Sequence, residues 1–224
     1  MKPTKEYKGR STIRMFNVDC MEYMNYYNGK AKVDLAIVDP PYFEEYGKEN
    51  YTGNDVSTTN VNRQTNEIKH WEIPDKEYFE LLSKVSINRI VWGVNYYAKY
   101  INDVGRIIWD KRNDSSTFSK CEIASHSQGV RVDMFRFMWN GMLQEDMKNK
   151  EKRIHPTQKP VALYKWLLTN YWGDTILDTH GGSMSIAIAC WDLGFDLDIC
   201  ELDTDYFNDA VKRFENHISQ TQLF

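Results

Sequence analysis

The chain has 224 residues with a net charge of −4 and many aromatic residues, namely 14 Tyr, 10 Phe and 7 Trp. This length allows one large domain or two small ones with a sizeable core, and the acidic balance excludes a globally basic surface, so any nucleic-acid contacts must be local. The four cysteines have no metal-ligand spacing, and neither a signal peptide nor an apolar run of membrane-spanning length is visible, which together predict a cytoplasmic protein with free thiols.

The first 140 residues predict strands and helices around one long irregular stretch. Residues 44–70 are rich in Asn, Thr, Gly and Glu and lack apolar periodicity, and a loop of this length in a compact domain is functional or disordered. Asp19 is placed as a helix N-cap, and Pro74-Asp75 is interpreted as a helix start. The expected strands are 11–18, 33–38, 89–93, 106–109 and 131–139, the last with alternating apolar residues, and the expected helices begin at 20 and 75.

The tetrapeptide Asp39-Pro40-Pro41-Tyr42 follows the apolar run 33–38 directly. Two prolines cannot extend a strand, so the chain must leave the sheet at the strand's carboxyl end, where open α/β sheets bind ligands. There the chain offers a carboxylate, a carbonyl and an aromatic ring, which suits a planar, amino-bearing base. An ordinary strand exit stiffened by proline fits these four residues equally well.

The last quarter of the chain predicts a regular series of helices and strands. A helix at 160–171 is followed by a strand at 175–178, a helix at 184–193, a strand at 196–200 and a helix at 203–217. Strands that alternate with helices indicate a doubly wound, mainly parallel α/β sheet. We find no repeat and no domain boundary, so residues 1–224 are interpreted as a single domain.

A second motif, 178–183, lies between a strand and a helix in this series. Its glycines let the backbone approach a ligand closely. Glu201 ends the next strand nineteen positions after Gly182, the spacing at which an acidic residue binds ribose hydroxyls in a dinucleotide-binding unit. Met184 stands where a third glycine is expected, so a nucleoside-bearing ligand without a pyrophosphate fits better. A tight turn followed by a solvated Glu is the alternative.

Three motifs in this order resemble the S-adenosylmethionine-dependent amino-group DNA methyltransferases: the tetrapeptide 39–42, His155-Pro156-Thr157-Gln158-Lys159-Pro160, and 178–183 followed by 200–203. The catalytic motif precedes the cofactor motif, as in the circularly permuted β-type members. The resemblance implies a Rossmann-like class I methyltransferase fold with a seven-stranded sheet. It further implies that the strands at 106–110 and 131–139 form an antiparallel edge.

The resemblance also implies a role for each matching residue. Asp39 and the Pro40 carbonyl would accept hydrogen bonds from the amine of the target base, and Tyr42, after Pro41, would stack on that base once it is flipped out. S-adenosyl-L-methionine would be the cofactor, and no metal is implied. Its binding residues would be Asp19 at the adenine, Thr157 and Lys159 at the methionine end, Glu201 at the ribose, and Asp178, His180, Gly182 and Ser183 in the glycine turn.

The resemblance leaves the target base and the activity open. Adenine N6 is favoured over cytosine N4 because relatives whose tetrapeptide begins with Asp mostly act on adenine. Protein-glutamine methylases have a related tetrapeptide, but it typically begins with Asn and the permuted order is missing. A catalytically silent nucleic-acid-binding subunit is the non-enzyme alternative, which Met184 mildly favours. The intact Asp39, Tyr42 and Glu201 favour an enzyme.

DNA is the expected partner, and we expect two irregular stretches, 44–70 and 141–154, to contact it. The densest basic cluster consists of Lys148, Lys150, Lys152 and Arg153, and Arg63 lies in the stretch after the catalytic motif. Solvated loops are the simpler interpretation of both stretches. The chain is too short for a large separate recognition domain, so sequence preference is weak or is supplied by a second copy or a partner subunit.

Overall fold

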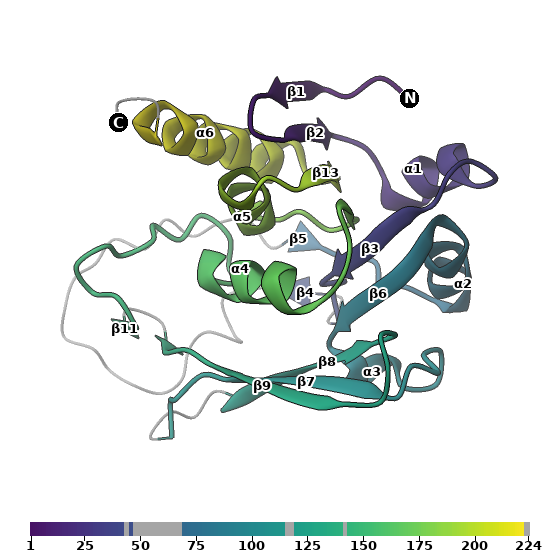
Figure 1. Cartoon of the computed structure of the whole chain (residues 1–224), viewed down its shortest axis with the longest axis horizontal. Coiled ribbons are helices and arrows are strands. Elements are labelled where there is room, and N and C mark those ends of the chain that lie inside the picture. Colours follow the sequence, from purple (N-terminus) through teal and green to yellow (C-terminus); the bar gives the residue numbers. More distant parts are fainter. Residues whose placement is uncertain (43–44, 47–68, 115–118, 141–142, 222–224) are drawn as a thin grey trace.

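In the computed structural model, which describes residues 1–42, 45–46, 69–114, 119–140 and 143–221, nine strands form one sheet (Figure 1). They are β1 Lys5–Lys8, β2 Thr12–Phe16, β3 Val33–Val38, β6 Ser86–Trp92, β7 Gly105–Asp110, β8 Cys121–His126, β9 Val132–Arg136, β12 Thr175–Asp178 and β13 Asp196–Cys200. From edge to edge their order is β1-β2-β13-β12-β3-β6-β8-β7-β9. The predicted mixed α/β fold with a large, mostly parallel sheet is confirmed.

Five neighbouring strands, β2, β13, β12, β3 and β6, form the parallel centre of the sheet. Strands in such a position are covered on both faces and therefore consist mostly of apolar residues. In β3 the last four residues, Leu35 to Val38, are all at most 1% exposed. The apolar run that predicted this strand is thus a consequence of its central position.

Helices cover both faces of the sheet (Figure 1). On one face lie α1 Cys20–Tyr27, α2 Lys76–Val85 and α3 Val94–Tyr97, and on the other lie α4 Val161–Asn170, α5 Ser185–Leu193 and α6 Thr204–Thr221. Each layer buries its own apolar cluster against the sheet. Asp19 and Asp75 accept hydrogen bonds from the first-turn N–H groups of α1 and α2, so the predicted N-cap at Asp19 and the predicted helix start at Pro74-Asp75 are confirmed.

The sequence did not predict β8, and this changes the arrangement of the sheet edge. β8 lies between β6 and β7 and is antiparallel to both, whereas β7 and β9 are parallel to each other. The expectation that 106–110 and 131–139 form an antiparallel edge was therefore wrong. A seven-stranded count was also too low, because β1 and β8 join the seven expected strands. β8 contains Glu122, Ser125 and His126, which mask a strand pattern in the sequence although the last two are fully buried.

Two small two-stranded sheets accompany the main sheet. β4 Glu45–Tyr46 pairs with β5 Lys69–His70, and β10 Trp139–Asn140 pairs with β11 Leu143–Gln144. The rest of the predicted irregular stretch 44–70 lies outside the described residues. Within the described ranges, no helix is long and apolar enough to cross a membrane.

Candidate active site

The carboxyl ends of the central parallel strands open into a cavity of about 1230 Å³. Asp39 follows β3, the turn 179–183 follows β12, and Glu201 follows β13, and all of them line this cavity. Parallel strands present their carboxyl ends at the same edge of a sheet, where open α/β folds bind ligands. Two motifs that are far apart in the sequence therefore share one cavity.

The turn 39–42 is held in place by a buried tyrosine of α3. The Tyr97 hydroxyl donates a hydrogen bond to the Pro41 carbonyl and lies 3.3 Å from the Pro40 carbonyl. A carbonyl oxygen has two lone pairs, so the Pro40 oxygen can accept another donor. Pro40 and Pro41 both line the cavity, as the sequence predicted for a motif that leaves the sheet at this edge.

Asp39 uses one of its two carboxylate oxygens within the protein. Oδ2 accepts a hydrogen bond from the Lys159 ammonium, whereas Oδ1 is buried and has no hydrogen-bond partner among the described residues. A buried acceptor without a donor destabilises a protein by about 1–3 kcal/mol. Because Asp39 lines the cavity, this oxygen is suited to accept a hydrogen bond from a ligand.

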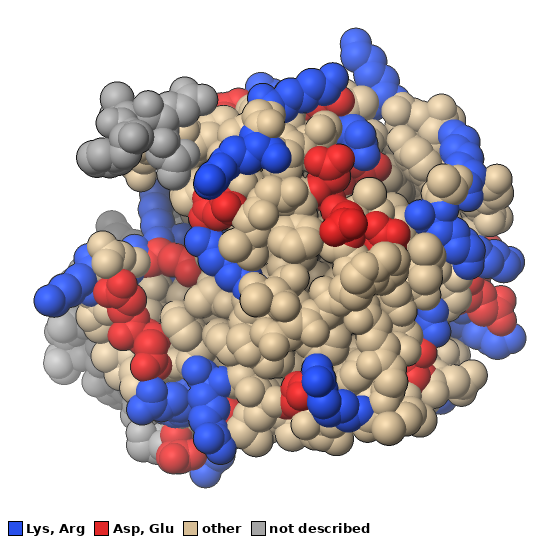
Figure 2. Space-filling model, viewed as in Figure 1, with Lys and Arg blue, Asp and Glu red and all other residues tan. Residues whose placement is uncertain are grey.

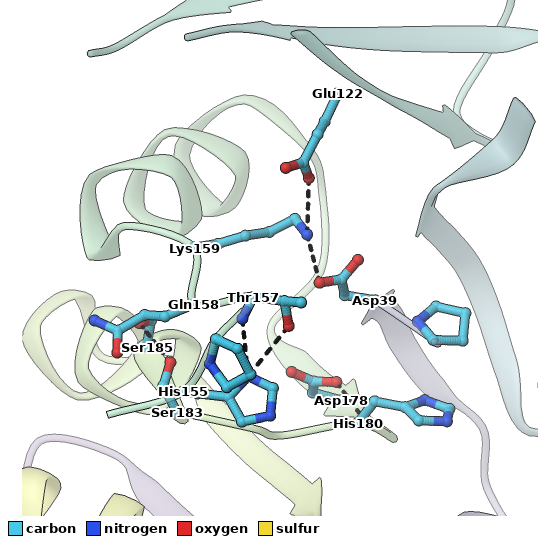
Figure 3. A network of polar contacts seen from close by, with 12 residues as sticks. Asp39, Glu122, His155, Thr157, Gln158, Lys159, Asp178, His180, Ser183 and Ser185 are labelled. Atoms are coloured by element: carbon cyan, nitrogen blue, oxygen red, sulfur yellow. Dashed lines mark hydrogen bonds and ion pairs between the residues drawn. The ribbon is translucent and has the colours of Figure 1, made fainter. Parts of the chain in front are cut away.

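A chain of alternating charges extends from Asp39 into the sheet (Figure 3). The Lys159 ammonium lies 2.9 Å from Glu122 Oε2 of β8, and Glu122 Oε1 lies 2.5 Å from the Lys111 ammonium after β7. Lys159 is only 3% exposed. A buried ammonium is tolerated where carboxylates compensate its lost hydration, and here two carboxylates do so.

These charges shift the pKa values of the groups in opposite directions. Burial raises the pKa of Asp39, and the Lys159 ammonium only partly offsets this effect. Burial also acts to raise the pKa of Glu122, but Lys159 and Lys111 together lower that pKa to about 2. Burial acts to lower the pKa of Lys159, yet the two carboxylates raise it well above its ordinary value. Lys159 and Glu122 are therefore both ionised at neutral pH.

The Tyr42 ring lies against the backbone of the loop that follows β6. Gly93 has a φ of +71°, and a Cβ atom on it would lie 2.7 Å from the Tyr42 ring. Only glycine combines this left-handed conformation with such a close contact. The Tyr96 ring stacks on Tyr42 with a centroid distance of 4.6 Å and an interplanar angle of 3°. The cavity wall beside Asp39 thus contains two parallel aromatic rings.

The glycine turn and Glu201 are joined by backbone hydrogen bonds. Glu201 Oε2 accepts a bond from the Gly182 N–H at 2.7 Å, and Oε1 accepts one from the Asp203 N–H at 2.8 Å. Gly182 has a φ of +50°, and a Cβ atom on it would be 3.4 Å from the His155 ring. The absent side chain thus keeps this part of the cavity floor open, and Glu201 stands beside it in a fixed orientation.

Asp178 is buried below this floor, and His180 beside it is half-buried. Asp178 Oδ1 accepts a hydrogen bond from the His180 N–H at 2.9 Å. Burial raises the pKa of Asp178 to about 8 and lowers the pKa of His180 to about 4. The His180 ring is therefore neutral at pH 7, and its Nδ1 lies 2.9 Å from the Thr179 hydroxyl. His180 lines the cavity, whereas Asp178 supports the turn from behind.

Three further predicted residues, Asp19, Thr157 and Ser183, also line the cavity. Asp19 caps α1 through Oδ1, which accepts hydrogen bonds from the N–H groups of Met21 and Glu22. The Thr157 hydroxyl lies 3.1 Å from His155 Nδ1, and the Ser183 hydroxyl is buried. The structure thus gathers the predicted catalytic and cofactor-binding residues around one cavity, with Asp178 as the exception.

No family model matches the chain, and no curated protein matches it. Among solved structures, the M1.HpyAVI–SAM complex is similar with a TM-score of 0.55 and 19% identity, covering 90% of this chain and 99% of that chain. PvuII DNA methyltransferase, which is cytosine-N4-specific, gives a TM-score of 0.57 at 11% identity, covering 90% and 86%. TTHA0409 from Thermus thermophilus, a putative DNA modification methylase complexed with S-adenosyl-L-methionine, gives 0.54 at 13% identity, covering 91% and 93%.

The chain has the fold of DNA methyltransferases. The resemblance that the three motifs predicted is thereby confirmed at the level of the fold. The similarity covers between 86% and 99% of the compared chains, so it extends over most of their length.

The predicted basic residues are distributed unequally on this methyltransferase fold. Lys148, Lys150 and Lys152 are exposed. Arg153 instead lines the cavity, donates a hydrogen bond to the Pro156 carbonyl at 2.8 Å and packs over the Trp139 ring. Arg63 lies outside the described residues. Figure 2 shows Lys and Arg interspersed with Asp and Glu on one face, so this face has no continuous basic surface.

Sequence reasoning missed Glu122, Lys111 and Tyr97. Glu122 lies in the strand that was not predicted, and Lys111 follows a predicted strand without belonging to any motif. Tyr97 belongs to none of the three motifs. The only sequence signal at Glu122 is a carboxylate next to the apolar residue Ile123, which does not by itself indicate a site. Its pairing with Lys159, which precedes α4, arises only when the chain folds.

Proposed function

We propose that the protein transfers a methyl group from S-adenosyl-L-methionine to the exocyclic amine of a flipped-out DNA base. The carrying observation is that a single cavity contains the turn 39–42, whose Asp39 Oδ1 has no partner in the described part of the chain, together with the open floor at Gly182 and the fixed carboxylate of Glu201. The solved structures of similar fold include complexes with this cofactor. Bound S-adenosyl-L-methionine would supply an electrophilic methyl group on a sulfonium.

The cavity residues fit this cofactor in three parts. Glu201 would accept the ribose hydroxyls, because carboxylate oxygens retain lone pairs after one N–H bond each. Asp19 would contact the adenine, and Thr157 and the turn around Ser183 would contact the methionine end. Met184 is buried beneath the cavity rather than lining it, so the missing third glycine leaves the space for a nucleoside unobstructed.

The residues of the turn would prepare the target amine for attack. Asp39 Oδ1 and the Pro40 carbonyl would accept its two N–H groups, which draws the nitrogen toward tetrahedral geometry and localises its lone pair. The nitrogen would then bond to the methyl group that the cofactor supplies while the carbon–sulfur bond breaks and the thioether leaves, and the proton that the nitrogen loses would pass to solvent. Holding the reactants in line can account for about 7–11 kcal/mol of the barrier. Tyr42, stacked on Tyr96, would hold the base.

Adenine N6 is the proposed target, because relatives whose motif begins with Asp mostly act on adenine. Cytosine N4 is a second candidate, since the cytosine-N4-specific PvuII enzyme has a similar fold. Incubation of unmethylated plasmid DNA with the purified protein and cofactor, followed by mass spectrometry of the nucleosides, distinguishes N6-methyladenine from N4-methylcytosine. Cofactor binding without either product would indicate a catalytically silent subunit, and no cofactor binding would refute the proposal.

We propose the exposed lysines 148, 150 and 152 as phosphate contacts. Replacing all three by Gln should weaken DNA binding on every sequence and reduce the salt dependence by a slope of about one per lost contact. The matched control replaces three exposed lysines in other elements, Lys2, Lys8 and Lys84, by Gln. An equal salt slope in the two triple variants would place the DNA contacts elsewhere.

We also propose that the fold is circularly permuted, because the catalytic motif precedes the cofactor motif along the chain.

A further inference from the structure

Lys159 is positioned by the protein itself. Its ammonium lies between Asp39, which follows β3, and Glu122 of β8, and its side chain is 2% exposed (Figure 3). Because one carboxylate lies directly after β3 and the other lies in β8, the sheet determines where the ammonium sits. Resemblance alone gave Lys159 to the methionine end of the cofactor, but two carboxylates of the protein already neutralise this ammonium and occupy two of its three N–H donors.

This ammonium in turn orients Asp39. It fixes Oδ2, and Oδ1 of this cavity-lining residue remains buried without a partner among the described residues. Glu122 holds Lys159 on the side away from Asp39, and Lys111, 2.5 Å from Glu122, holds that carboxylate. Loss of Lys159 would leave Asp39 buried without a compensating charge, and such a carboxyl group tends to take up a proton.

We propose that Lys159 and Glu122 are positioning residues that hold Asp39 as an oriented, ionised acceptor for the target amine, and that Lys159 is not a ligand of the cofactor. The inference rests on the proposed methyl transfer, because it assigns the pair a task within that reaction. Neither residue touches the base. The pair acts through Asp39.

The charges around Asp39 determine the pH at which this carboxylate takes up a proton. Burial raises the pKa of Asp39, the Lys159 ammonium lowers it and the Glu122 carboxylate raises it. Removing the ammonium should therefore move protonation of Asp39 to higher pH, and removing the Glu122 charge should move it to lower pH. The charged and titratable groups around Asp39 are Lys159 before α4, Glu122 of β8, Lys111 after β7, Asp178 of β12, Tyr42 of the same turn, Tyr97 of α3 and Tyr164 of α4.

The test compares Lys159→Met and Glu122→Gln with the wild type in single-turnover methylation across pH, at saturating cofactor and DNA. Lys159→Met should shift the acidic limb of the rate profile upward by roughly 1–3 pH units, the range for loss of a neighbouring opposite charge. Glu122→Gln should shift it downward by a smaller amount. Calorimetry should show the wild-type affinity for S-adenosyl-L-methionine in both variants.

A matched control breaks a similar ion pair outside the cavity. Asp103→Asn removes the partner of Arg89, whose guanidinium lies 2.8 Å from the Asp103 carboxylate, and should leave the pH profile unchanged. If Lys159→Met does not fold, Glu122→Gln alone carries the test through the sign of its shift. A tenfold loss of cofactor affinity in Lys159→Met would overturn the inference. So would acidic limbs of the pH–rate profiles that do not shift in the stated directions. Failure of the wild type to bind cofactor and methylate DNA would instead refute the proposed function.

Discussion

Two carboxylates at the same edge of the sheet, Glu201 after β13 and Asp39 after β3, are held in different ways. Both oxygens of Glu201 accept backbone N–H groups, from Gly182 and Asp203. Asp39 has one oxygen on the Lys159 ammonium and one without a partner among the described residues. The main chain therefore orients Glu201, whereas a charged side chain orients Asp39.

This difference determines which changes can disturb the orientation of each carboxylate. Backbone donors remain when side chains are substituted and do not titrate, so the orientation of Glu201 depends on the turn itself. The orientation of Asp39 depends on Lys159 and, through it, on Glu122. A binding residue can be fixed by the main chain, but an acceptor that must remain ionised while buried needs a nearby cation. We expect the Asp39 side of the cavity to be more sensitive to pH and to distant substitutions.

The largest effect should come from Asp39→Ala. Loss of an acceptor that acts in the transition state should lower the single-turnover methylation rate by about 10²–10³-fold, the magnitude known for a single group in an oxyanion hole. Cofactor affinity should stay at the wild-type value, because Asp39 contacts the amine rather than the cofactor. Rapid-quench measurements and calorimetry on the same preparation provide both values. A wild-type rate would remove Asp39 from the reaction.

Glu201→Ala should weaken cofactor binding rather than slow methylation, and its effect should be smaller than that of Asp39→Ala. Loss of charge-assisted bonds to the ribose hydroxyls should weaken cofactor binding by about 1.5–3 kcal/mol, or roughly 10- to 150-fold in Kd. The methylation rate at saturating cofactor should change little. Glu201→Gln is the matched control, because its amide retains one acceptor oxygen at the same position. Equal cofactor affinity in wild type and Glu201→Ala would refute the ribose contact.

Asp178 lies behind the glycine turn, and its pKa depends on burial and on the carboxylates of both sites. Its pKa is raised to about 8, with burial as the main cause and the charges of Asp39 and Glu201 contributing. An unfolded Asp titrates near ~3.9, so between these values the folded protein keeps a proton that the unfolded chain has lost. The stability that this carboxyl contributes is therefore present at low pH and is lost as the pH rises toward 8.

Asp178→Asn removes this dependence. Urea unfolding from pH 5 to 9 should show the wild type losing stability relative to Asp178→Asn by up to about 1.4 kcal/mol per pH unit until pH 8, and no further change above it. The Asn side-chain oxygen can still accept the His180 N–H, so the turn should be preserved. A constant difference across the range would mean that Asp178 ionises normally.

Local sequence patterns predicted most of the sheet and the residues around the cavity. The apolar run 33–38 and the two prolines after it placed Asp39 at a strand end, and the helix–strand alternation of the last quarter placed Glu201 at another. These signals are local, because a strand, a cap or a turn is specified by neighbouring residues. The cavity then follows from the rule that parallel strands end at the same edge.

Pairings between distant segments could not be predicted in this way. Glu122 meets Lys159 only because β8 inserts between β6 and β7. Its strand carries Ser125 and His126, which are buried through contacts that the sequence does not reveal; His126 Nε2, for example, lies 2.9 Å from the Arg131 carbonyl oxygen. The same limit explains the misassigned edge, since strand direction depends on the partner.

The order of the strands along the chain has a consequence for how the protein folds. β2 and β3 are early in the chain but are joined only through β13 and β12, which follow every other strand of the sheet. Until those two strands arrive, β2 and β3 would have unpaired edges, which are prone to aggregation. Such long-range pairing slows folding. A growing chain therefore cannot acquire its cavity in stages, and no partly synthesised form should bind a nucleoside.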